Sequence, residues 1–372
     1  MLLAVSAIAQ TSLNPDISVV GDFRAYGHND ESRSDETETL NLADPSMELV
    51  AAGYLNPYAR ADVVVGWHGE HSAEIEEVYA TILRGLPLGM NLKVGKYLLE
   101  FGRLNPVHEH AWSFIERPLP HTAFFGEEGL NGTAVRTSFL LPTGEAYTEL
   151  MVGALGGEIL EGHSHEHEDD AEEEDHEEYD GHRDLGFFAR LTTSIAASDN
   201  SEIAFGGSLV NAVHGFAELE EEDSDEFPDQ LRSWLAGCDI KYKYKPSRYT
   251  ALQFEAEGIL RSDEQQEGDN LNSYGGYAYL DYRFAQKYNL GGIFEYLRQK
   301  QAHHHEDGDE EHIEIHEADT WRAGLFVGFA PIEETSLIRV AGHWTEPDEG
   351  DGFWEAQLQF VFSLGPHQPH NF

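Results

Sequence analysis

Apolar and polar residues alternate along most of this chain, in segments of about 10 to 13 residues. Alternation with a period of two is typical of a β-strand with one apolar and one polar face, and strands of this length suit a tilted crossing of a bilayer. Sixteen such segments follow one another from Ile17 onward. The predicted strands are 17–27, 45–54, 58–68, 73–84, 89–101, 131–141, 145–156, 184–196, 202–214, 231–244, 248–261, 273–284, 287–299, 319–330, 334–345 and 353–364.

The last predicted strand shows the alternation most clearly. One face carries Trp354, Ala356, Leu358, Phe360, Phe362 and Leu364, and the other carries Glu355, Gln357, Gln359 and Ser363. A lipid-facing side and a water-filled lumen would require this separation. Aromatic residues also gather near the predicted strand ends, where they would form the two interfacial girdles of a barrel. They include Tyr54, Tyr58, Tyr249, Phe284, Tyr288, Trp67, Trp321 and Trp344.

Short and long connections alternate between the predicted strands. The long, mostly polar connections are 28–44, 69–72, 102–130, 157–183, 215–230, 262–272, 300–318 and 346–352. In an up-and-down barrel, alternate connections lie at opposite rims, so all the long ones fall on one side. We therefore predict an all-β fold, a 16-stranded antiparallel up-and-down transmembrane β-barrel. A soluble β-sandwich or propeller is the alternative, but the segregation of loop lengths and the lack of a repeat of about 40 residues argue against it.

The composition excludes several classes of protein. The 372 residues include 69 acidic and 23 basic side chains, a formal charge of −46, and such a chain would repel nucleic acid. The lone cysteine, Cys238, rules out an internal disulfide framework and a cysteine-based zinc finger. No Gly-x-Ser-x-Gly nucleophile motif occurs, so a barrel enzyme lacks support and we expect no enzymatic activity.

The first nine residues look like the end of a secretory signal. Their apolar stretch is followed by the small-x-small sequence Ala7-Ile8-Ala9, which is typical of a cleavage site. A short buried strand is the alternative. We therefore expect a residual signal peptide at 1–9, a single barrel domain at 10–372, and a location in the bacterial outer membrane.

Acidic residues and histidines concentrate in the long connections. Four spans, 28–43, 157–183, 215–230 and 303–319, together hold 34 acidic side chains and only two Arg, and 18 of the 20 His fall on the same predicted rim. Neutral imidazole is a good ligand for Zn(II), Ni(II) or Cu(II), and a carboxylate can complete the ligand set. If 312–316 prolongs a strand, its two His and Glu314 share one face.

These connections predict weak, multisite, pH-dependent capture of a divalent metal such as zinc, without any required cofactor. The candidate ligands are His163, His165, His167, His176, His182, His303, His304, His305, His312, His316, His108 and His110. The alternative is that these are solvated low-complexity loops without a ligand.

The connection 102–130 differs from the others because it is rich in apolar residues, including Trp112, Phe114 and Ile115. A loop this hydrophobic should pack against something, and folding into the lumen would bury its apolar face against the wall. Here the chain resembles the porin superfamily, particularly the phosphate-selective-porin-like group of 16-stranded barrels. The likeness is carried by 95–102, 114–120 and 127–132, with the sequences GKYLLEFG, FIERPLP and EEGLNG.

The resemblance implies that the third loop narrows the pore and that subunits trimerise. It gives constriction roles to Glu109, Glu116, Arg117, Glu127 and Glu128, for which ordinary salt bridges to the wall are the alternative. The sequence departs from the phosphate-selective pattern, because an anion path needs a ladder of Arg and Lys and the predicted lumen positions carry both signs. Together with the acidic outer loops, this favours cations at the mouth.

The C-terminal residues 360–372 resemble an outer-membrane barrel terminus, which in that class is recognised by the barrel-insertion machinery. The ending GPHQPHNF is also similar to endings of His-rich outer-membrane proteins linked to zinc acquisition. We therefore expect a cation-preferring porin-like channel for passive diffusion of small solutes, with metal capture by its outer loops. Its partners would be outer-membrane lipid, small solutes and cations, the insertion machinery and two further copies of itself. A non-conducting metal-binding or surface-interaction barrel is the alternative, and an anion or phosphate porin is less favoured.

Overall fold

The computed structural model describes residues 15–33, 35–69, 72–156, 160, 184–217, 229–266, 268–307, 310–332, 335–348 and 350–365. The strands are β1 (Asp16–His28), β2 (Asn41–Leu42), β3 (Ser46–Asn56), β4 (Ala59–His68), β5 (Glu74–Ile82), β6 (Asn91–Leu98), β7 (Asn131–Leu141), β8 (Tyr147–Leu155), β9 (Gly186–Ser198), β10 (Ser201–Phe216), β11 (Gln230–Ser247), β12 (Thr250–Asp263), β13 (Leu271–Phe284), β14 (Tyr288–Asp307), β15 (Glu310–Ile332), β16 (Ser336–Pro347) and β17 (Phe353–Leu364). The short helices are η1 (Pro87–Gly89), η2 (Glu109–Ala111) and α1 (Leu119–Phe125). None of the described helices is long and apolar enough to cross a membrane.

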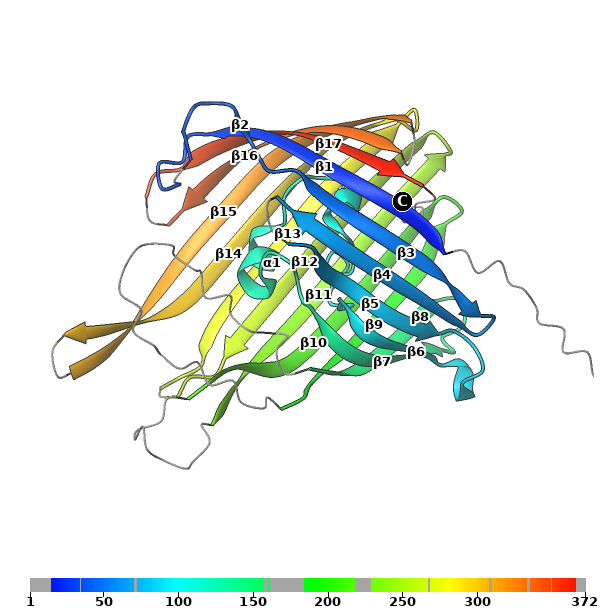
Figure 1. Ribbon diagram of the computed structural model, residues 1–372, viewed down its shortest axis with the longest axis horizontal. Helices are drawn as coiled ribbons and strands as arrows, with labels where there is room; N and C mark the ends of the chain where they lie inside the picture. Colours follow the sequence, from blue (N-terminus) through cyan, green and yellow to red (C-terminus); the bar gives the residue numbers. More distant parts are fainter. Residues whose placement is uncertain are drawn as a thin grey trace, which may run out of the picture.

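The strands form one closed sheet (Figure 1). Each long strand pairs antiparallel with its neighbours along the chain, and β1 pairs with both β3 and β17, which closes the barrel. The two-residue strand β2 only adds a short pairing to β1. Closure therefore pairs the first and the last strand of the sheet with each other, as in barrels that leave no open edge. The predicted 16-stranded antiparallel barrel is confirmed.

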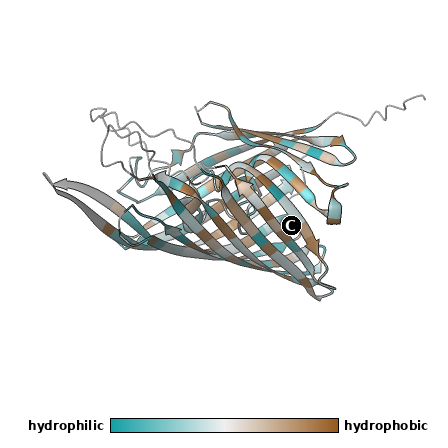
Figure 2. Ribbon diagram, turned by 90° about the horizontal axis from the view of Figure 1, so that it is seen from below, coloured by the Kyte–Doolittle hydropathy of each residue, from teal (hydrophilic) through white to brown (hydrophobic). Residues whose placement is uncertain are grey.

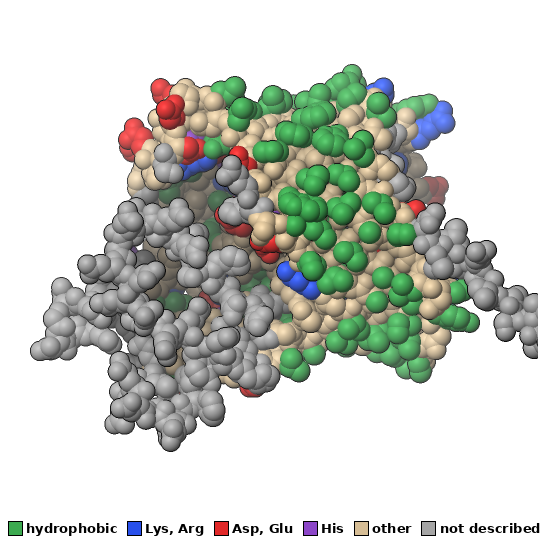
Figure 3. Space-filling model, viewed as in Figure 1, with side chains coloured by type: hydrophobic (Ala, Val, Ile, Leu, Met, Phe, Trp, Pro, Cys, Tyr) green, Lys and Arg blue, Asp and Glu red, His purple; other side chains and the backbone are tan. Residues whose placement is uncertain are grey.

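Side chains alternate between the two faces of the wall. In β17, Trp354, Leu358 and Phe360 are between 39% and 49% exposed on the outside, whereas Glu355 and Gln359 are buried on the lumen side. Hydrophobic and hydrophilic residues are interspersed along the strands in Figure 2, and hydrophobic side chains are spread over the visible wall in Figure 3. An apolar outer face of this extent is what a barrel presents to lipid.

Large aromatic side chains lie exposed at both ends of the wall. Those at the short-turn end include Tyr54, Tyr58, Tyr249, Phe284 and Tyr288, and those at the opposite end include Trp234, Trp321, Trp344 and Trp354. Tyr and Trp rings are favoured at membrane interfaces because each has an apolar body and a polar tip. The positions fit the two girdles expected from the sequence and mark the height of the apolar band.

The segment 300–318, which the sequence analysis predicted as a loop, is mostly β-strand. Most of it continues β14 and β15, which remain paired as far as Asp307 and Glu310 (Figure 1). Pairing satisfies the backbone donors and acceptors along the whole extension. The strand that the sequence analysis left open for 312–316 is the arrangement observed, because these residues belong to β15. Ile313 and Ile315 alternate there with polar neighbours.

The connection between β6 and β7, here called loop 3 (residues 99–130), folds into the lumen as predicted, and α1 lies inside the barrel in Figure 1. Gly102 has φ +61°, a left-handed conformation that favours glycine, and a Cβ there would collide with the Glu257 carboxylate. In the lumen, Trp112 and Phe114 pack with wall residues, and the Phe114 ring centroid lies 5.2 Å from that of Tyr279. Loop 3 therefore has a buried apolar contact with the wall.

Candidate functional site

Inward-facing charged side chains hold loop 3 by its backbone. Arg339 is 1% exposed, and its guanidinium donates to the carbonyls of His110 and Trp112 at 2.7 Å each and also to that of Phe114. Removing the guanidinium would leave buried carbonyl acceptors unpaired, at a cost of about 1–3 kcal/mol each. Arg339 therefore fixes the part of loop 3 that crosses the lumen.

Carboxylates and an amide fix the remainder of loop 3. Glu257 accepts the backbone N–H of Leu104 at 3.0 Å, and Glu295 accepts that of Leu119 at 2.7 Å. Asn105 joins the two ends of the loop, because its side chain bonds to the backbone of both Leu99 and Leu130. These contacts anchor loop 3 inside the barrel.

Loop 3 lies between two cavities of opposite charge. The outer cavity, of about 1050 Å³, is lined among the described residues by eleven carboxylates, four Arg and four His. The inner cavity, of about 280 Å³, is lined by six Lys or Arg side chains and by Asp281 as its one carboxylate. Val20 and His110 line both cavities and mark the level at which they approach each other.

All five predicted constriction residues line the outer cavity. Glu109 pairs with the wall residue Arg24 at 3.1 Å and with Arg117 at 3.2 Å. Glu116 pairs with Arg322 of β15 at 2.6 Å. Glu127 and Glu128 are exposed to the cavity. Salt bridges to the wall and a position at the outer cavity therefore coexist, and the role of these residues in narrowing the pore stays a prediction.

Two of the predicted metal ligands, His108 and His110, lie beside carboxylates of β3 and β5. His108 Nδ1 is 3.5 Å from Glu48 Oε2 and 3.6 Å from Glu76 Oε2, while His108 Nε2 is 3.1 Å from Glu77 Oε2. Burial disfavours the charged imidazole, but Glu48, followed by Glu77 and Glu76, outweighs it and raises the pKa of His108 to about 9. The His110 Nδ1 atom lies 3.3 Å from Glu48 Oε1.

The side chains of most of the other predicted metal ligands lie outside the described part of the structure. His163, His165, His167, His176 and His182 lie outside the described residues. The side chains of His303, His304, His305 and His312 also lie outside them, although their backbone belongs to β14 and β15, where His305 is opposite His312. His316 is exposed on β15. Their metal binding stays a prediction.

The sequence analysis missed Glu48, Glu76 and Glu77 as partners of His108. The register of β4 and β5 shifts so that Val64 faces Glu77 and Val65 faces Ile75, which leaves Glu76 as the extra residue of a β-bulge. The bulge lets two consecutive Glu side chains reach His108, which strict alternation would forbid. No residue pattern predicts this bulge. The one local signal is Gly66 on the neighbouring strand, whose missing side chain leaves the space that the Glu76 carboxylate occupies.

Sequence comparison finds a relative of undescribed function. No family model matches the chain. A protein of Aquifex aeolicus (strain VF5), described as uncharacterized, is 27% identical over 322 residues, which are 77% of this chain. The present chain spans 65% of the length of that relative.

Solved structures with the same fold are outer-membrane porins and channels. The anion-selective porin from Comamonas acidovorans has a TM-score of 0.59 and 7% identity, covering 94% of this chain and 98% of that one. The outer membrane channel DcaP of Acinetobacter baumannii has a TM-score of 0.55 and 13% identity, covering 95% and 99%. The trimer form of OmpT, an outer membrane protein of Vibrio cholerae, has a TM-score of 0.55 and 8% identity, covering 94% and 99%. The chain therefore has the fold of these outer-membrane barrels.

Proposed function

We propose that this protein is a porin-like channel through which small solutes diffuse passively, with a preference for cations and with capture of divalent metal at its outer mouth. The observation that carries the proposal is the outer cavity, whose lining carboxylates outnumber its Arg side chains by eleven to four. Fixed carboxylates raise the local concentration of cations over about one Debye length, roughly 8 Å in physiological salt. A polar lumen supplies the hydrated path that an ion needs.

The inner cavity supports a second candidate, an anion porin. Its cationic side chains include Lys243, Lys245, Arg248 and Arg283, and they would attract anions at the periplasmic end. We infer that the outer charge dominates, because four spans of the outer connections hold 34 acidic residues and only two Arg. Of these, Asp30 and Arg33 are already counted in the lining of the outer cavity. The net preference would be for cations, weakened by the inner cavity.

Reversal potentials in planar bilayers test this proposal. Purified protein in a potassium chloride gradient should give the sign expected for potassium permeation, and a Glu127→Gln/Glu128→Gln variant should shift the potential towards chloride, because both carboxylates face the outer cavity. A wild-type potential that favours chloride would establish the anion porin instead. Absence of any conductance would leave the non-conducting metal-binding barrel as the better account.

Metal capture by the His-rich connections and assembly into a homotrimer are further parts of the proposal. The likeness to a barrel with a trimer form supports the assembly, and the mass of the detergent-purified complex tests it. The amphipathic strand β17 would serve recognition by the insertion machinery, because one face is apolar and the other polar. We infer a channel rather than an enzyme, because charged and polar side chains line both cavities of the lumen and passive diffusion needs no chemical step.

A further inference from the structure

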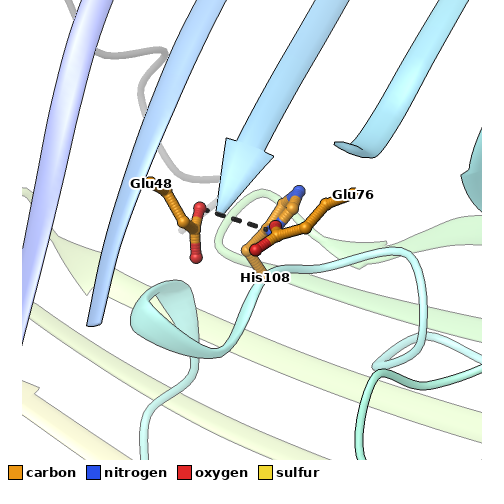
Figure 4. Close-up of side chains that lie close together, drawn as sticks. All are labelled: Glu48, Glu76 and His108. Carbon is orange, nitrogen blue, oxygen red and sulfur yellow. Dashed lines mark ion pairs between the residues drawn. The ribbon is translucent and has the colours of Figure 1, made fainter. Parts of the chain in front are cut away.

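We propose that Glu48, Glu76 and His108 form a binding site for one divalent transition-metal ion of the zinc class, on the wall of the outer cavity. Glu48 comes from β3, Glu76 from β5 and His108 from loop 3, and the three side chains point towards one another (Figure 4). The inference rests on the proposed function, because the metal must enter through the outer cavity. The binding step itself does not require conduction.

The spacing of the ligand atoms suits a small cation. One ligand atom from each of the three residues lies within 4.8 Å of the others. In a tetrahedral zinc site, bonds of about 2.0–2.2 Å place ligand atoms roughly 3.3–3.6 Å apart. The distances from His108 Nδ1 to Glu48 Oε2, 3.5 Å, and to Glu76 Oε2, 3.6 Å, already match this separation. The candidate ligand oxygens of the two carboxylates lie within 4.8 Å of each other.

Each candidate ligand is oriented by a second contact on its far side. His108 Nε2 lies 3.1 Å from Glu77 Oε2, and Glu77 is itself held by the backbone N–H of Leu98 at 2.9 Å. A metal-bound imidazole characteristically donates its other N–H to a carboxylate, which fixes the ring and increases its basicity. This contact is an independent sign of a metal ligand, because it leaves Nδ1 directed at the two remaining carboxylates.

The two carboxylates are oriented in the same way. Glu48 Oε1 lies 3.3 Å from His110 Nδ1, and Glu76 Oε1 lies 3.1 Å from His68 Nε2. Glu48 Oε2 is buried and has no hydrogen-bond partner, although it faces His108. A buried carboxylate oxygen without a hydrogen bond is costly, and a cation would compensate it.

A second His and carboxylate cluster in the same cavity makes a useful contrast. Glu116, His343 and Glu355 also lie within reach of one ion. There, however, Arg322 pairs with Glu116 and Arg33 pairs with Glu355, so guanidinium groups already balance the carboxylates. Among the described residues, the ion pairs of Glu48 and Glu76 involve only His side chains. A metal ion can displace a proton from an imidazole, but it cannot displace a tethered guanidinium without losing an ion pair.

The chemistry of the site favours transient binding. A metal ion would take the place of the proton on His108 Nδ1, and that proton would leave to solvent. Three protein ligands leave at least one coordination position for water, as in zinc sites that exchange their fourth ligand. The side chains of Glu48, Glu76 and His108 are 17%, 18% and 22% exposed, so the position opens to the cavity. Imidazole in the set selects zinc, copper or nickel over magnesium or calcium.

Zinc binding to the full chain in detergent tests the site. The ten His of the outer connections at 163–182 and 303–316 are first changed to Gln, so that they do not contribute. Zinc is then titrated against a competing chelator into this parent and into the same chain with His108→Gln or Glu77→Gln. His343→Gln is the matched control, because His343 also lies beside two carboxylates of the outer cavity.

The parent should bind one zinc ion in the presence of millimolar magnesium. Glu77→Gln keeps a carbonyl acceptor for Leu98 and should weaken binding about 10- to 100-fold, the usual effect of removing such an orienting carboxylate. His108→Gln should weaken it further, and His343→Gln should leave it unchanged. Equal affinity in the parent and His108→Gln would overturn the proposal, provided that the metal-free proteins share one thermal transition by circular dichroism.

The same samples test the zinc site and the channel proposal separately. If the parent binds zinc through His108 but no variant conducts in a bilayer, the channel proposal fails and the site stands. If the channels conduct but zinc affinity is unaffected by His108→Gln, the site fails and the channel stands. The natural chain should bind more zinc ions per molecule than the parent does. This difference measures the metal capture by the outer connections separately from the Glu48, Glu76 and His108 site.

Discussion

At the scale of single residues, His108 has three carboxylates around its imidazole, those of Glu48, Glu76 and Glu77. Since these raise its pKa to about 9, the stabilisation of loop 3 by the imidazolium is complete below about 6.5 and is lost as pH rises through 9. We expect NMR of the metal-free protein to show a His108 titration midpoint near 9, its signal being identified by loss in His108→Gln. Glu48→Gln should lower the midpoint, because Glu48 contributes the largest favourable charge. A wild-type midpoint at or below about 6.5 would contradict this environment.

At the scale of elements, the bulge between β4 and β5 decides which side chains reach the outer cavity. A Cβ at Gly66 would overlap the Glu76 carboxylate and would lie 3.1 Å from the His68 ring, and both groups are ends of flexible side chains. We therefore expect Gly66→Ala to leave the barrel folded but to turn Glu76 away, weakening zinc binding about tenfold or more. Gly207→Ala on β10 is the control, since a Cβ there meets only one backbone oxygen at 4.0 Å. Unchanged zinc affinity in Gly66→Ala would show that Glu76 is not a ligand.

At the scale of the whole molecule, loop 3 divides a lumen whose two ends carry opposite charge. The basic inner cavity should oppose the cation preference of the outer one. Changing Lys245 and Arg248 to Gln should therefore raise the permeability ratio of potassium to chloride by about two- to fivefold, since exposed charges contribute up to about 1 kcal/mol. Both residues lie outside loop 3, so pore size should not change. A ratio that stays the same would mean that the inner cavity does not lie on the ion path.

The sequence by itself determined the wall of the barrel. Period-two alternation is a local property, because neighbouring residues of a strand must face opposite sides. For this reason the sixteen alternating segments, from 17–27 to 353–364, predicted the number of strands and the apolar face of several of them. No knowledge of tertiary contacts was needed. The inward fold of loop 3 was also predictable from the sequence, because a loop that contains Trp112 and Phe114 needs an apolar surface to pack against.

Only the tertiary structure decided how the charged groups meet. Glu48 and His108 are distant in the chain, and they approach because barrel closure and the inward fold of loop 3 bring β3 and η2 together. A one-residue bulge directs Glu76 and Glu77 to the same imidazole, and nothing in the local sequence specifies it. The register of a bulge and the path of a loop depend on packing across the whole lumen, whereas the alternation of a strand depends only on its own residues.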